Sequence, residues 1–410
     1  MPIDSGDTTW MLLASSLVLL MTPALGFFEA GLLRVKNALS VIMQCFFGLA
    51  LLSVMWFIFG FSLTFGPDIG GIAGTLEWTF LSNVPVEEPL EQYAPTIPGI
   101  LFAKFQMMFA VITPLLLTGA IAERMKWSSF AIFIVAWSLF IYYPLVHWVW
   151  GDGGWLRELG VADFAGGIVI HTSAGMGSLA AALVLGRRKD FGPEVMTPHN
   201  IPLAVLGSSL LWIGWFGFNA GSSLAAGGLA ANTIVTTHMA SAVSSLVWIF
   251  MSWARTGKPS TIAAINGAIA GLAGITPASG FVSVQHSFII GIVVGIASYL
   301  GIVFLKEKWK VDDALDVSSV HGITGIIGSM AIGIFASQAV NPAGPVGLLF
   351  GNPMQLAIQG VGVGVAAGMG FGGTVLILKI IDVIMGLRVK EQTEDIGLDI
   401  AEHAERAYTI

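Results

Sequence analysis

Apolar residues form long runs along the chain, separated by short polar breaks. The runs are about 20 residues long, which is the length that a helix needs to cross the hydrocarbon core of a membrane. They are continuously apolar rather than alternating, and this favours helices over a β-barrel. We predict eleven spans, near residues 10–32, 38–66, 99–121, 128–150, 164–185, 201–219, 232–254, 261–278, 286–305, 319–337 and 353–384. The expected fold class is an all-α integral membrane protein.

Composition supports this fold class. Of the 410 residues, 55% are hydrophobic and 10% are charged, whereas soluble domains carry about 25% charged residues. Such a chain cannot cover a water-facing surface, and its abundance of apolar residues also rules out disorder. The net charge of −7 and the lack of a basic stripe exclude nucleic acid as an expected partner. The single cysteine, Cys45, excludes a disulfide framework and a thiolate metal cluster.

The distribution of Lys and Arg predicts the orientation, because cytoplasmic loops carry an excess of these residues. Most of the 18 basic residues fall after the first, third, fifth, seventh and ninth spans or in the tail. Segment 67–98, on the other side, is acidic and contains none. We expect a multi-pass protein of the cytoplasmic (inner) membrane, with its N-terminus outside and its C-terminus in the cytoplasm. The opening MPIDSGDTT lacks a basic residue, so the first run is interpreted as a retained span.

Two histidines at membrane depth indicate a functional site, because ionisable groups there are costly. His171 and His321 each follow an aspartate, Asp163 and Asp313, by eight residues. Eight helical residues rise about 12 Å, and the two helices enter a core of about 30 Å from opposite faces. Both histidines are therefore expected near the midplane. This pattern predicts an inverted five-helix repeat, spans 1–5 and 6–10, plus one additional long helix, and a shared pore site rather than two separate core histidines.

Aromatic residues gather at the predicted outer mouth. Phe105 and Phe109 are four residues apart and share a helix face, Trp150 ends the fourth span, and WFGFNAGS (215–222) ends the sixth. Taken singly, each would be an interface anchor or a packing residue. Taken together with the hydroxyl of Ser222, they predict a cation–π site for a small cation.

These residues resemble the ammonium transporter (Amt/Rh) family, of the Amt type, over about residues 8–408 of the chain. The similarity lies in many short segments that follow one another in the family's order. They are GAIAER (119–124), DFAGG (163–167) running through His171 to LGRR (185–188), WFGFNAGS, GAIAGLAGITPASG (267–280), the VDD…D…VHG stretch (311–322) and GLRV (386–389).

The resemblance implies a role for each candidate residue. The outer ammonium recruitment site would contain Trp150, Phe109, Ser222 and Phe105, and the gate beneath it Phe109 and Phe218. The pore would contain the twin histidines His171 and His321, with structural support from Asp163, Asp313 and Asn219. The implied assembly is a homotrimer in the lipid bilayer with one pore per subunit, and no cofactor or metal is implied.

The chemistry of ammonium makes a mechanism of this kind coherent. Stripping water from an ion in an apolar channel costs many kcal/mol, and ammonium avoids this cost by shedding a proton whereas potassium cannot. The hypothesis is that ammonium loses its proton near the gate and that ammonia crosses the pore. The proton would follow a separate route through the histidines or bound water, so transport would be electrogenic. A neutral imidazole suits this role because it both donates and accepts a hydrogen bond.

Three positions depart from the family pattern. Glu29 lies where many relatives have an uncharged aromatic residue, and it either pairs with Arg34 or the helix ends, or acts as a charge in the cytoplasmic vestibule. Asn266 replaces a common small hydroxyl residue and is expected to rewire a hydrogen bond to Asp163 or the vestibule. Lys104 either snorkels to water or weakens recruitment by repulsion.

The chain divides into a transmembrane domain, residues 1–385, and a cytoplasmic regulatory tail, residues 386–410. The segment GLDIAEHAERAYTI resembles the family's regulatory tail, with Ala404 where a glycine is often found. Binding of a P-II signalling protein and a solvated tail without a partner both stay open. A further C-terminal domain, removed from this chain, also stays open.

The leading functional interpretation is an ammonium transporter. The main alternative is an ammonium sensor that binds the ion and conducts little. The departures from the family pattern at Glu29, Lys104 and Asn266 favour this alternative. A gas channel of the Rh type fits less well, because the full set of Trp150 and Ser222 is present. An enzyme is not expected, since the sequence lacks a metal cluster, a nucleophile–base set and a phosphate loop.

Overall fold

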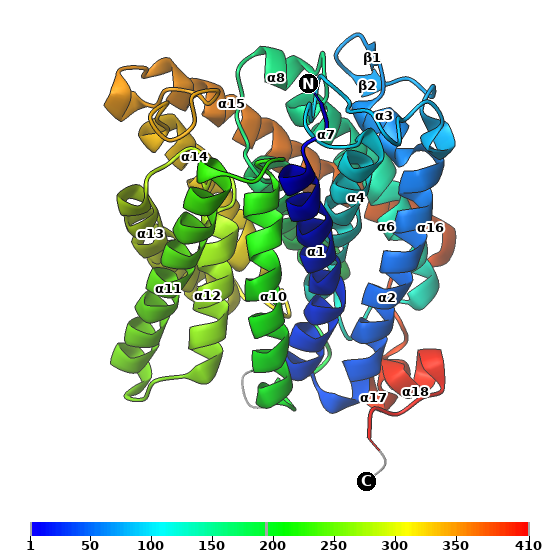
Figure 1. The fold of residues 1–410 in the computed structure, drawn as a ribbon. Helices are drawn as coiled ribbons and strands as arrows, with labels where there is room; N and C mark the ends of the chain where they lie inside the picture. Colours follow the sequence, from blue (N-terminus) through cyan, green and yellow to red (C-terminus); the bar gives the residue numbers. More distant parts are fainter. Residues whose placement is uncertain (1, 193–195, 409–410) are drawn as a thin grey trace.

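The computed structural model describes residues 2–192 and 196–408. Long helices stand side by side in one bundle, and the two ends of the chain lie at opposite ends of it (Figure 1). We call the end that carries the N-terminus the amino-terminal face and the other end the carboxyl-terminal face. The loops that contain the small sheet lie at the amino-terminal face, whereas the last short helices lie at the carboxyl-terminal face (Figure 1).

The predicted spans are confirmed. In the described part of the chain, ten helical segments are long and apolar enough to cross a membrane: Ser5–Leu32, Val35–Phe65, Gly99–Ile121, Trp127–Glu158, Gly167–Leu185, Ile201–Gly221, Gly228–Thr256, Val284–Lys308, Ser318–Phe335 and Met354–Met385. A shorter apolar helix, Thr261–Ile275, occupies the place of the span predicted at 261–278. The protein is thus an all-α membrane protein with eleven apolar helical segments in its described residues.

The first half of the bundle contains α1 (Ser5–Leu32), α2 (Ala38–Met55), α3 (Phe61–Phe65), α4 (Gly99–Leu115), α5 (Thr118–Ile121), α6 (Trp127–Trp137), α7 (Tyr143–Trp150), α8 (Trp155–Glu158) and α9 (Ser173–Leu185). The second half contains α10 (Ile201–Gly221), α11 (Gly228–Thr256), α12 (Thr261–Ile275), α13 (Val284–Ile302) and α14 (Thr324–Phe335). The last span is formed by α15 (Met354–Gly368) and α16 (Thr374–Met385), and α17 (Glu391–Ile396) and α18 (Leu398–His403) follow it.

Shorter elements interrupt or join these helices. Six π-helical turns are η2 (Trp56–Gly60), η4 (Ser138–Tyr142), η5 (Gly167–Thr172), η6 (Val303–Lys308), η7 (Ser318–Ile323) and η9 (Met369–Gly373). Three 3₁₀ turns are η1 (Val35–Asn37), η3 (Thr79–Leu81) and η8 (Leu348–Phe350). Strands β1 (Asp68–Ile69) and β2 (Ala73–Gly74) pair antiparallel, with Asp68 opposite Gly74. The π-turns η5 and η7 carry the two histidines, and such turns are frequent at functional sites.

Polar residues mark where several helices begin. Asp4 caps α1 by accepting a hydrogen bond from the amide of Asp7 at 2.8 Å, and Asn200 caps α10 through the amide of Leu203. Ser283 does the same for α13. These caps satisfy amides that have no partner inside the helix, so short polar residues at the ends of apolar runs fix the helix boundaries.

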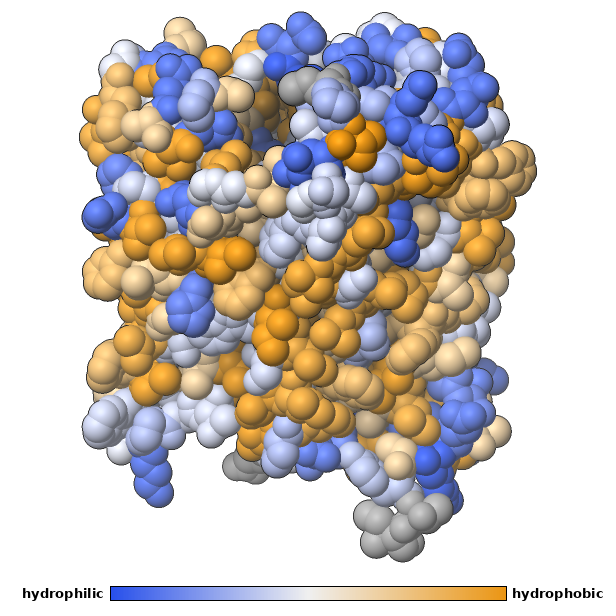
Figure 2. Space-filling model, in the orientation of Figure 1, coloured by the Kyte–Doolittle hydropathy of each residue, from blue (hydrophilic) through white to orange (hydrophobic). Residues whose placement is uncertain are grey.

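The surface of the bundle matches a membrane environment. On the face shown in Figure 2, apolar residues form a broad band across the middle, and polar residues gather at both ends. Large apolar side chains such as Leu12, Phe46, Phe140, Leu246 and Phe250 are exposed on the membrane-spanning segments. A soluble protein rarely exposes so much apolar surface, whereas lipid chains cover it without cost.

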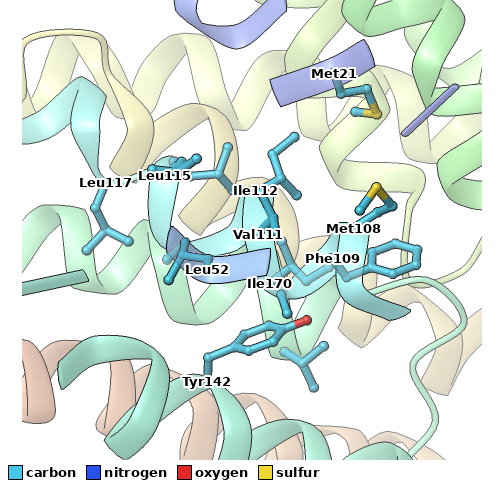
Figure 3. Packing of buried hydrophobic residues seen from close by; sticks show 14 of the residues in the cluster. Met21, Leu52, Met108, Phe109, Val111, Ile112, Leu115, Leu117, Tyr142 and Ile170 are labelled. Carbon is cyan, nitrogen blue, oxygen red and sulfur yellow. The ribbon is translucent and has the colours of Figure 1, made fainter. Parts of the chain in front are cut away.

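The two halves meet at the centre of the bundle. Helix α1 lies along α10, so the first helices of the two halves of the predicted repeat are neighbours (Figure 1). Their contact depends on small residues: a Cβ at Gly207 would lie 2.3 Å from the amide nitrogen of Phe28. Side chains of α1, α2, α4 and η5 fill the adjoining core, including Met21, Phe109 and Ile170 (Figure 3). Close approach through glycine is typical of helices that pack in lipid.

Candidate substrate pathway and its histidine pair

A vestibule opens towards the amino-terminal face. Its lining combines aromatic rings with polar groups, namely Phe65, Gln92, Tyr93, Phe102, Gln106, Phe109, Val149, Trp150, Arg157, Asp163, Phe164, Ser222, Leu224, Phe281 and Asn341. Burial raises the pKa of Tyr93 to about 12, so its phenol stays neutral and donates to the carbonyl of Phe65. The structure therefore brings Trp150, Phe109 and Ser222 together in one vestibule, as predicted.

Two phenylalanines close the bottom of this vestibule. The rings of Phe109 and Phe218 meet edge to face at 4.5 Å between centroids, and Phe109 also lies 6.0 Å from the ring of Trp150. Phe105 is fully buried behind Phe109, with 4.9 Å between the ring centroids, and is not among the residues that line the vestibule. Phe109 faces the vestibule, whereas Phe218 lines the next cavity, so this ring pair separates the two spaces.

The two histidines lie in contact below the ring pair. The Nδ1 atoms of His171 and His321 are 3.1 Å apart, and the rings are 25° from parallel. The cavity around them is otherwise apolar or aromatic, lined by Met21, Leu25, Phe28, Ile112, Leu116, Ile170, Leu211, Trp215, Phe218 and Ile269. The spacing from the two aspartates predicts both histidines near the midplane, and in the structure the two rings lie in contact.

The contact limits a neutral pair to two arrangements of its hydrogens. Only one of the two Nδ1 atoms carries a hydrogen, because one ring must donate and the other accept. The ring that donates has an acceptor at Nε2, and the other ring has an N–H there. Nε2 of His171 is buried and makes no hydrogen bond to the described residues. The pair can therefore receive a hydrogen bond at one end and give one at the other.

An aspartate holds the start of each histidine segment. The carboxylate of Asp163 accepts hydrogen bonds of 2.7 to 3.1 Å from the amides of Gly166, Gly167, Ile168 and Val169. It thereby satisfies the free amides at the start of the helical segment that carries His171. The carbonyl of Asp163 accepts from the indole of Trp150 at 2.8 Å, which links the vestibule to this segment.

The second histidine segment is held by fewer bonds. One carboxylate oxygen of Asp313 accepts from both the amide and the hydroxyl of Ser318, and the other oxygen makes no hydrogen bond to the described residues. The two segments meet through glycines: a Cβ at Gly175 would lie 2.2 Å from Cα of Gly322. Only glycine at position 175 permits this approach, which allows the segments that carry the two histidines to pack together.

Residues around the vestibule complete the predicted set. The hydroxyl of Ser222 donates to the carbonyl of Phe218 at 2.9 Å, so its lone pairs are available to the vestibule. Asn219 is fully buried, and its amide donates to the hydroxyl of Thr237 at 3.0 Å. Asn219 therefore ties α10 to α11 and does not line the vestibule.

A third cavity continues from the histidines towards the carboxyl-terminal face. It shares Leu25, Phe28, Leu116, Ile269 and His321 with the histidine cavity and adds Glu29, Asn266, Leu315, Val317 and Val320. The vestibule, the ring pair, the histidine cavity and this inner cavity form one line through the bundle.

The partners of Glu29 differ from one expectation. Its carboxyl oxygen Oε2 lies 2.7 Å from the hydroxyl of Thr118, whereas Arg34 pairs with Glu123 at 2.9 Å. Arg34 lies beyond the end of α1, where the chain turns away from Glu29. The expected pair of Glu29 with Arg34 is thus wrong, and the alternative position, in a cavity on the path, is the one that the structure shows.

The other two departures also have definite places. Asn266 lines the inner cavity with Glu29 and His321, so it does not contact Asp163. Lys104 is half-buried, and its ammonium group lies 3.8 Å from the sulfur of Met108. Lys104 is not among the residues that line the vestibule.

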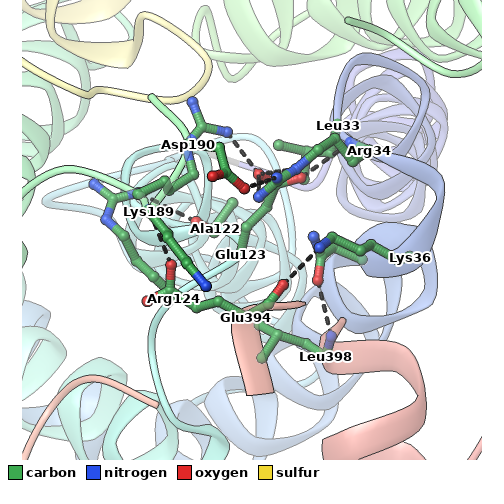
Figure 4. Close-up of polar contacts among 12 residues, drawn as sticks. Leu33, Arg34, Lys36, Ala122, Glu123, Arg124, Lys189, Asp190, Glu394 and Leu398 are labelled. Atoms are coloured by element: carbon green, nitrogen blue, oxygen red, sulfur yellow. Dashed lines mark hydrogen bonds and ion pairs between the residues drawn. The ribbon is translucent and has the colours of Figure 1, made fainter. Parts of the chain in front are cut away.

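Buried ion pairs cluster at the carboxyl-terminal face (Figure 4). Glu123 pairs with both Arg34 and Arg188, and Arg188 also pairs with Asp312 at 2.7 Å. Burial alone would raise the pKa of Glu123 and of Asp312, but the adjacent guanidinium groups outweigh it and lower both pKa values. The cluster joins the ends of four spans through charges that are ionised at neutral pH.

The tail packs against the start of the second span, next to this cluster, rather than extending freely. Arg388 pairs with Glu394, and the ammonium group of Lys36 donates to the carbonyl of Glu394 at 2.6 Å (Figure 4). The carboxylate of Asp399 accepts from the amide of Ser40 at the start of α2. Ala404, at the end of α18, has a φ of 58°, which is the left-handed region that favours glycine.

Sequence reasoning did not assign a role to several residues of the path. Trp215 stacks on His171 with 5.6 Å between the rings, and Gln106 and Arg157 line the vestibule. Trp215, Phe218 and Ser222 are three and four residues apart on α10, so helical spacing alone could have placed Trp215 on the face of the path. Gln106 and Arg157 offered no comparable signal.

The fold and the cavities define a helical membrane protein with an internal path for a small solute. The family profile described as Ammonium Transporter Family matches residues 9–408. The chain is 54% identical to Ammonium transporter 1 of Dictyostelium discoideum, over 99% of this chain and 88% of that protein. It is 45% identical to Ammonium transporter Amt1 of Archaeoglobus fulgidus, over 99% of this chain and all of that protein.

Solved structures agree with these relatives. The structure of Mep2 from Saccharomyces cerevisiae superposes with a TM-score of 0.88 at 35% identity, over 95% of this chain and 88% of that one. A structure named Sensor Amt Protein superposes with a TM-score of 0.89 at 32% identity, over 97% and 98% of the two chains. The chain belongs to the ammonium transporter family, and this membership supports ammonium transport as its function.

Proposed function

We propose that the protein recruits ammonium in the vestibule, removes a proton from it and passes ammonia along the histidine pair. Trp150 and Phe109 offer aromatic faces to the cation, and Ser222 offers a hydroxyl oxygen. The observation that carries the proposal is the 3.1 Å contact between Nδ1 of His171 and Nδ1 of His321 in an otherwise apolar cavity. Such a cavity suits a neutral solute that makes hydrogen bonds, whereas a bare cation would lose its hydration there.

The separated proton then follows its own route, so the transport cycle moves one positive charge. The imidazole pair can relay a proton because each ring both accepts and donates. Phe109 and Phe218 must part for the solute to enter, which makes them the gate. Asp163, Asp313 and Asn219 hold the backbone around this path through their hydrogen bonds.

The charge distribution supports an orientation with the amino-terminal face outside the cell and the carboxyl-terminal face in the cytoplasm. The proposed location is the cytoplasmic membrane, and the proposed assembly is a homotrimer with one path in each subunit. Residues 1–385 would form the transport domain and residues 386–410 a regulatory tail. The tail's contacts with Lys36 and Ser40 support regulation from the cytoplasm, with a P-II signalling protein as its candidate partner.

Ammonium sensing is the second candidate function. One structure with the same fold is named a sensor, and in our protein the ring pair of Phe109 and Phe218 is closed. A sensor would keep the vestibule that binds ammonium but conduct little. The histidine pair speaks for transport, because a protein that only binds ammonium in the vestibule does not need it.

Currents from purified protein in liposomes on a solid-supported membrane test the proposal. We expect a sustained current after an ammonium pulse, no current after a potassium pulse, and a loss of at least about tenfold in the double variant His171→Ala, His321→Ala. A wild-type protein that binds ammonium without current or ammonia flux would be a sensor. A His171→Ala variant with an unchanged ammonium current and no potassium leak would contradict the proposed role of the pair.

A further inference from the structure

Glu29 is a buried carboxyl group on the proposed path that the mechanism above does not use. It lies in α1 with 2% of its surface exposed, and among the described residues no cationic nitrogen lies within 4.0 Å of its carboxyl oxygens. Ionised carboxylates inside apolar protein are normally paired, because burying an unpaired charge is costly. The position of Glu29 therefore calls for an explanation other than an ion pair.

The hydrogen bonds of Thr118 suit two protonation states of Glu29. The Thr118 hydroxyl lies 2.7 Å from Oε2 of Glu29 and also contacts the carbonyl oxygen of Leu115. A hydroxyl has one hydrogen, and a carbonyl oxygen can only accept. When the hydroxyl donates to Leu115, the carboxyl must be protonated and donate to Thr118. When the hydroxyl turns to Glu29, it stabilises the carboxylate instead.

The titratable groups around Glu29 come from three packed elements. Cys45 of α2 and Asp313, which precedes η7, lie close enough to interact electrostatically with its carboxyl group. His321 of η7 lines the same cavity, and α12 contributes the uncharged Asn266. The thiol and the second carboxyl group supply no positive charge. His321 is therefore the basic group that shares this cavity with Glu29.

We propose that Glu29 is a proton-exchanging residue at the cytoplasmic end of the path, which protonates ammonia after it leaves His321. The O–H bond of the carboxyl breaks, an N–H bond forms, and ammonium leaves with the carboxylate behind it. The carboxylate then takes up the proton that the histidine pair relayed from the outer end. The net result is one ammonium ion moved inwards, with all atoms and charges balanced. This inference rests on the proposed transport mechanism.

The geometry favours this role over a purely structural one. A structural carboxyl needs only its hydrogen bonds to Thr118 and to the backbone of Gly119, and it gains nothing from lining a cavity. Glu29 instead lines the inner cavity together with His321, which also lines the histidine cavity. Ammonia that leaves the imidazole therefore enters the space that the carboxyl group lines, before it reaches the carboxyl-terminal face.

Replacement of Glu29 by Gln distinguishes a role in proton exchange from a purely structural role. The amide has nearly the same shape and keeps a hydrogen bond to Thr118, but it cannot give up and regain a proton. In reconstituted liposomes we expect Glu29→Gln to lower the ammonium current by at least about tenfold. Ammonia entry, followed as alkalinisation of the lumen, should persist. Glu29→Asp, which retains a carboxyl group, should restore part of the current. Glu307→Gln, the same change at an exposed residue of the carboxyl-terminal face, serves as the matched control and should leave the current unchanged.

A spectroscopic measurement gives a second readout. Infrared difference spectra after an ammonium pulse should contain a carboxylic acid band that disappears in Glu29→Gln, and a structural carboxyl would not change its protonation in this way. An unchanged current in Glu29→Gln beside an active wild type overturns the inference alone. Loss of both current and ammonia entry in Glu29→Gln also overturns it, because the variant then merely blocks the path. A wild type without current and without ammonia entry overturns the proposed transport function itself.

Discussion

The two histidine segments share a plan but are held in different ways. In both, an aspartate lies eight residues before the histidine, and its carboxylate accepts hydrogen bonds from one or more backbone amides at the start of a π-helical turn. Asp163 uses both carboxylate oxygens for four backbone amides, whereas Asp313 uses one oxygen for Ser318 alone. The first segment is thus fixed through its backbone, and the second retains an unpartnered oxygen beside the cavity of Glu29.

The residues before the aspartates differ as well. Ala162 is held by neutral hydrogen bonds, since its amide and its carbonyl both bond to the side chain of Gln359. Asp312, at the matching position, is held by the charged side chain of Arg188. The residue before Asp163 is therefore held by neutral hydrogen bonds, whereas the residue before Asp313 is held by an ion pair that requires both partners to be ionised. This difference teaches that related halves can share a geometry and still respond differently to pH.

The largest expected effect comes from removing the two caps. Asp163→Ala leaves four buried amides without an acceptor and should destabilise the protein by about 4 kcal/mol or more, with loss of transport. Asp313→Ala removes two bonds and should cost about half as much. Thermal unfolding in detergent, followed by tryptophan fluorescence, measures both. Equal losses in the two variants would show that the number of cap bonds does not decide stability.

Acid should weaken the ion cluster at the carboxyl-terminal face, which joins Glu123 and Arg188 of the first half to Asp312 of the second. The pKa values of Glu123 and Asp312 are lower in the folded protein, so these groups stabilise it above their unfolded-state pKa values of 4.5 and 3.8. That contribution disappears as the pH falls through the lowered folded-state values. Unfolding midpoints recorded from neutral pH down to about pH 3 should fall more steeply in wild type than in Asp312→Asn, which is already destabilised at neutral pH by about 3 kcal/mol. Parallel curves would argue against the ion cluster as the cause.

The contact between the halves should be asymmetric. A methyl group at Gly175 would meet backbone atoms at 2.2 Å, whereas one at Gly322 has its nearest neighbour at 3.2 Å. Gly175→Ala should therefore cost about 1–3 kcal/mol and lower the ammonium current, while Gly322→Ala should cost less. Unfolding midpoints and currents of the two variants, measured side by side, give the comparison. A more severe Gly322→Ala variant would contradict the packing described here.

The smallest expected effect lies in the tail, outside both halves. Ala404→Gly relieves a left-handed backbone conformation and should stabilise the end of α18 by about 1 kcal/mol. The rate at which a protease cleaves the tail should fall by several fold, while the midpoint of global unfolding stays the same. Faster cleavage would indicate that the gain in flexibility of the unfolded tail outweighs the relief.

The sequence predicted the features that depend on long apolar runs or on a repeated spacing between residues. The eleven spans followed from runs of apolar residues, and equal spacing to the two aspartates predicted a shared site for His171 and His321. The 3.1 Å contact of the histidines could not be predicted in this way, because it depends on how the two halves pack through Gly175.

The partner of Glu29 could not be predicted from residues that are close to it in the sequence. Arg34 is close to it in sequence, but Arg34 lies beyond the helix end and pairs with Glu123, which is 89 residues away. The partner of Glu29, Thr118, is equally distant along the chain. Trp215 lay within a recognised segment, yet its stacking on His171 follows from packing across helices. In each of these cases the partner of the residue belongs to another element. Spacing within one element therefore cannot predict it.

Because the two Nδ1 atoms are in contact, the position of the bridging hydrogen depends on whether the pair has already relayed a proton. A proton that enters at the outer ring and leaves from the inner ring moves the bridging hydrogen from one Nδ1 to the other. The hydrogen bond between the two rings then runs in the opposite direction. The pair cannot relay a second proton inwards until both rings have exchanged their hydrogens again. In the proposed mechanism each cycle would therefore contain a resetting step that involves no substrate, and the speed of that step would set an upper limit on how fast charge can follow ammonia.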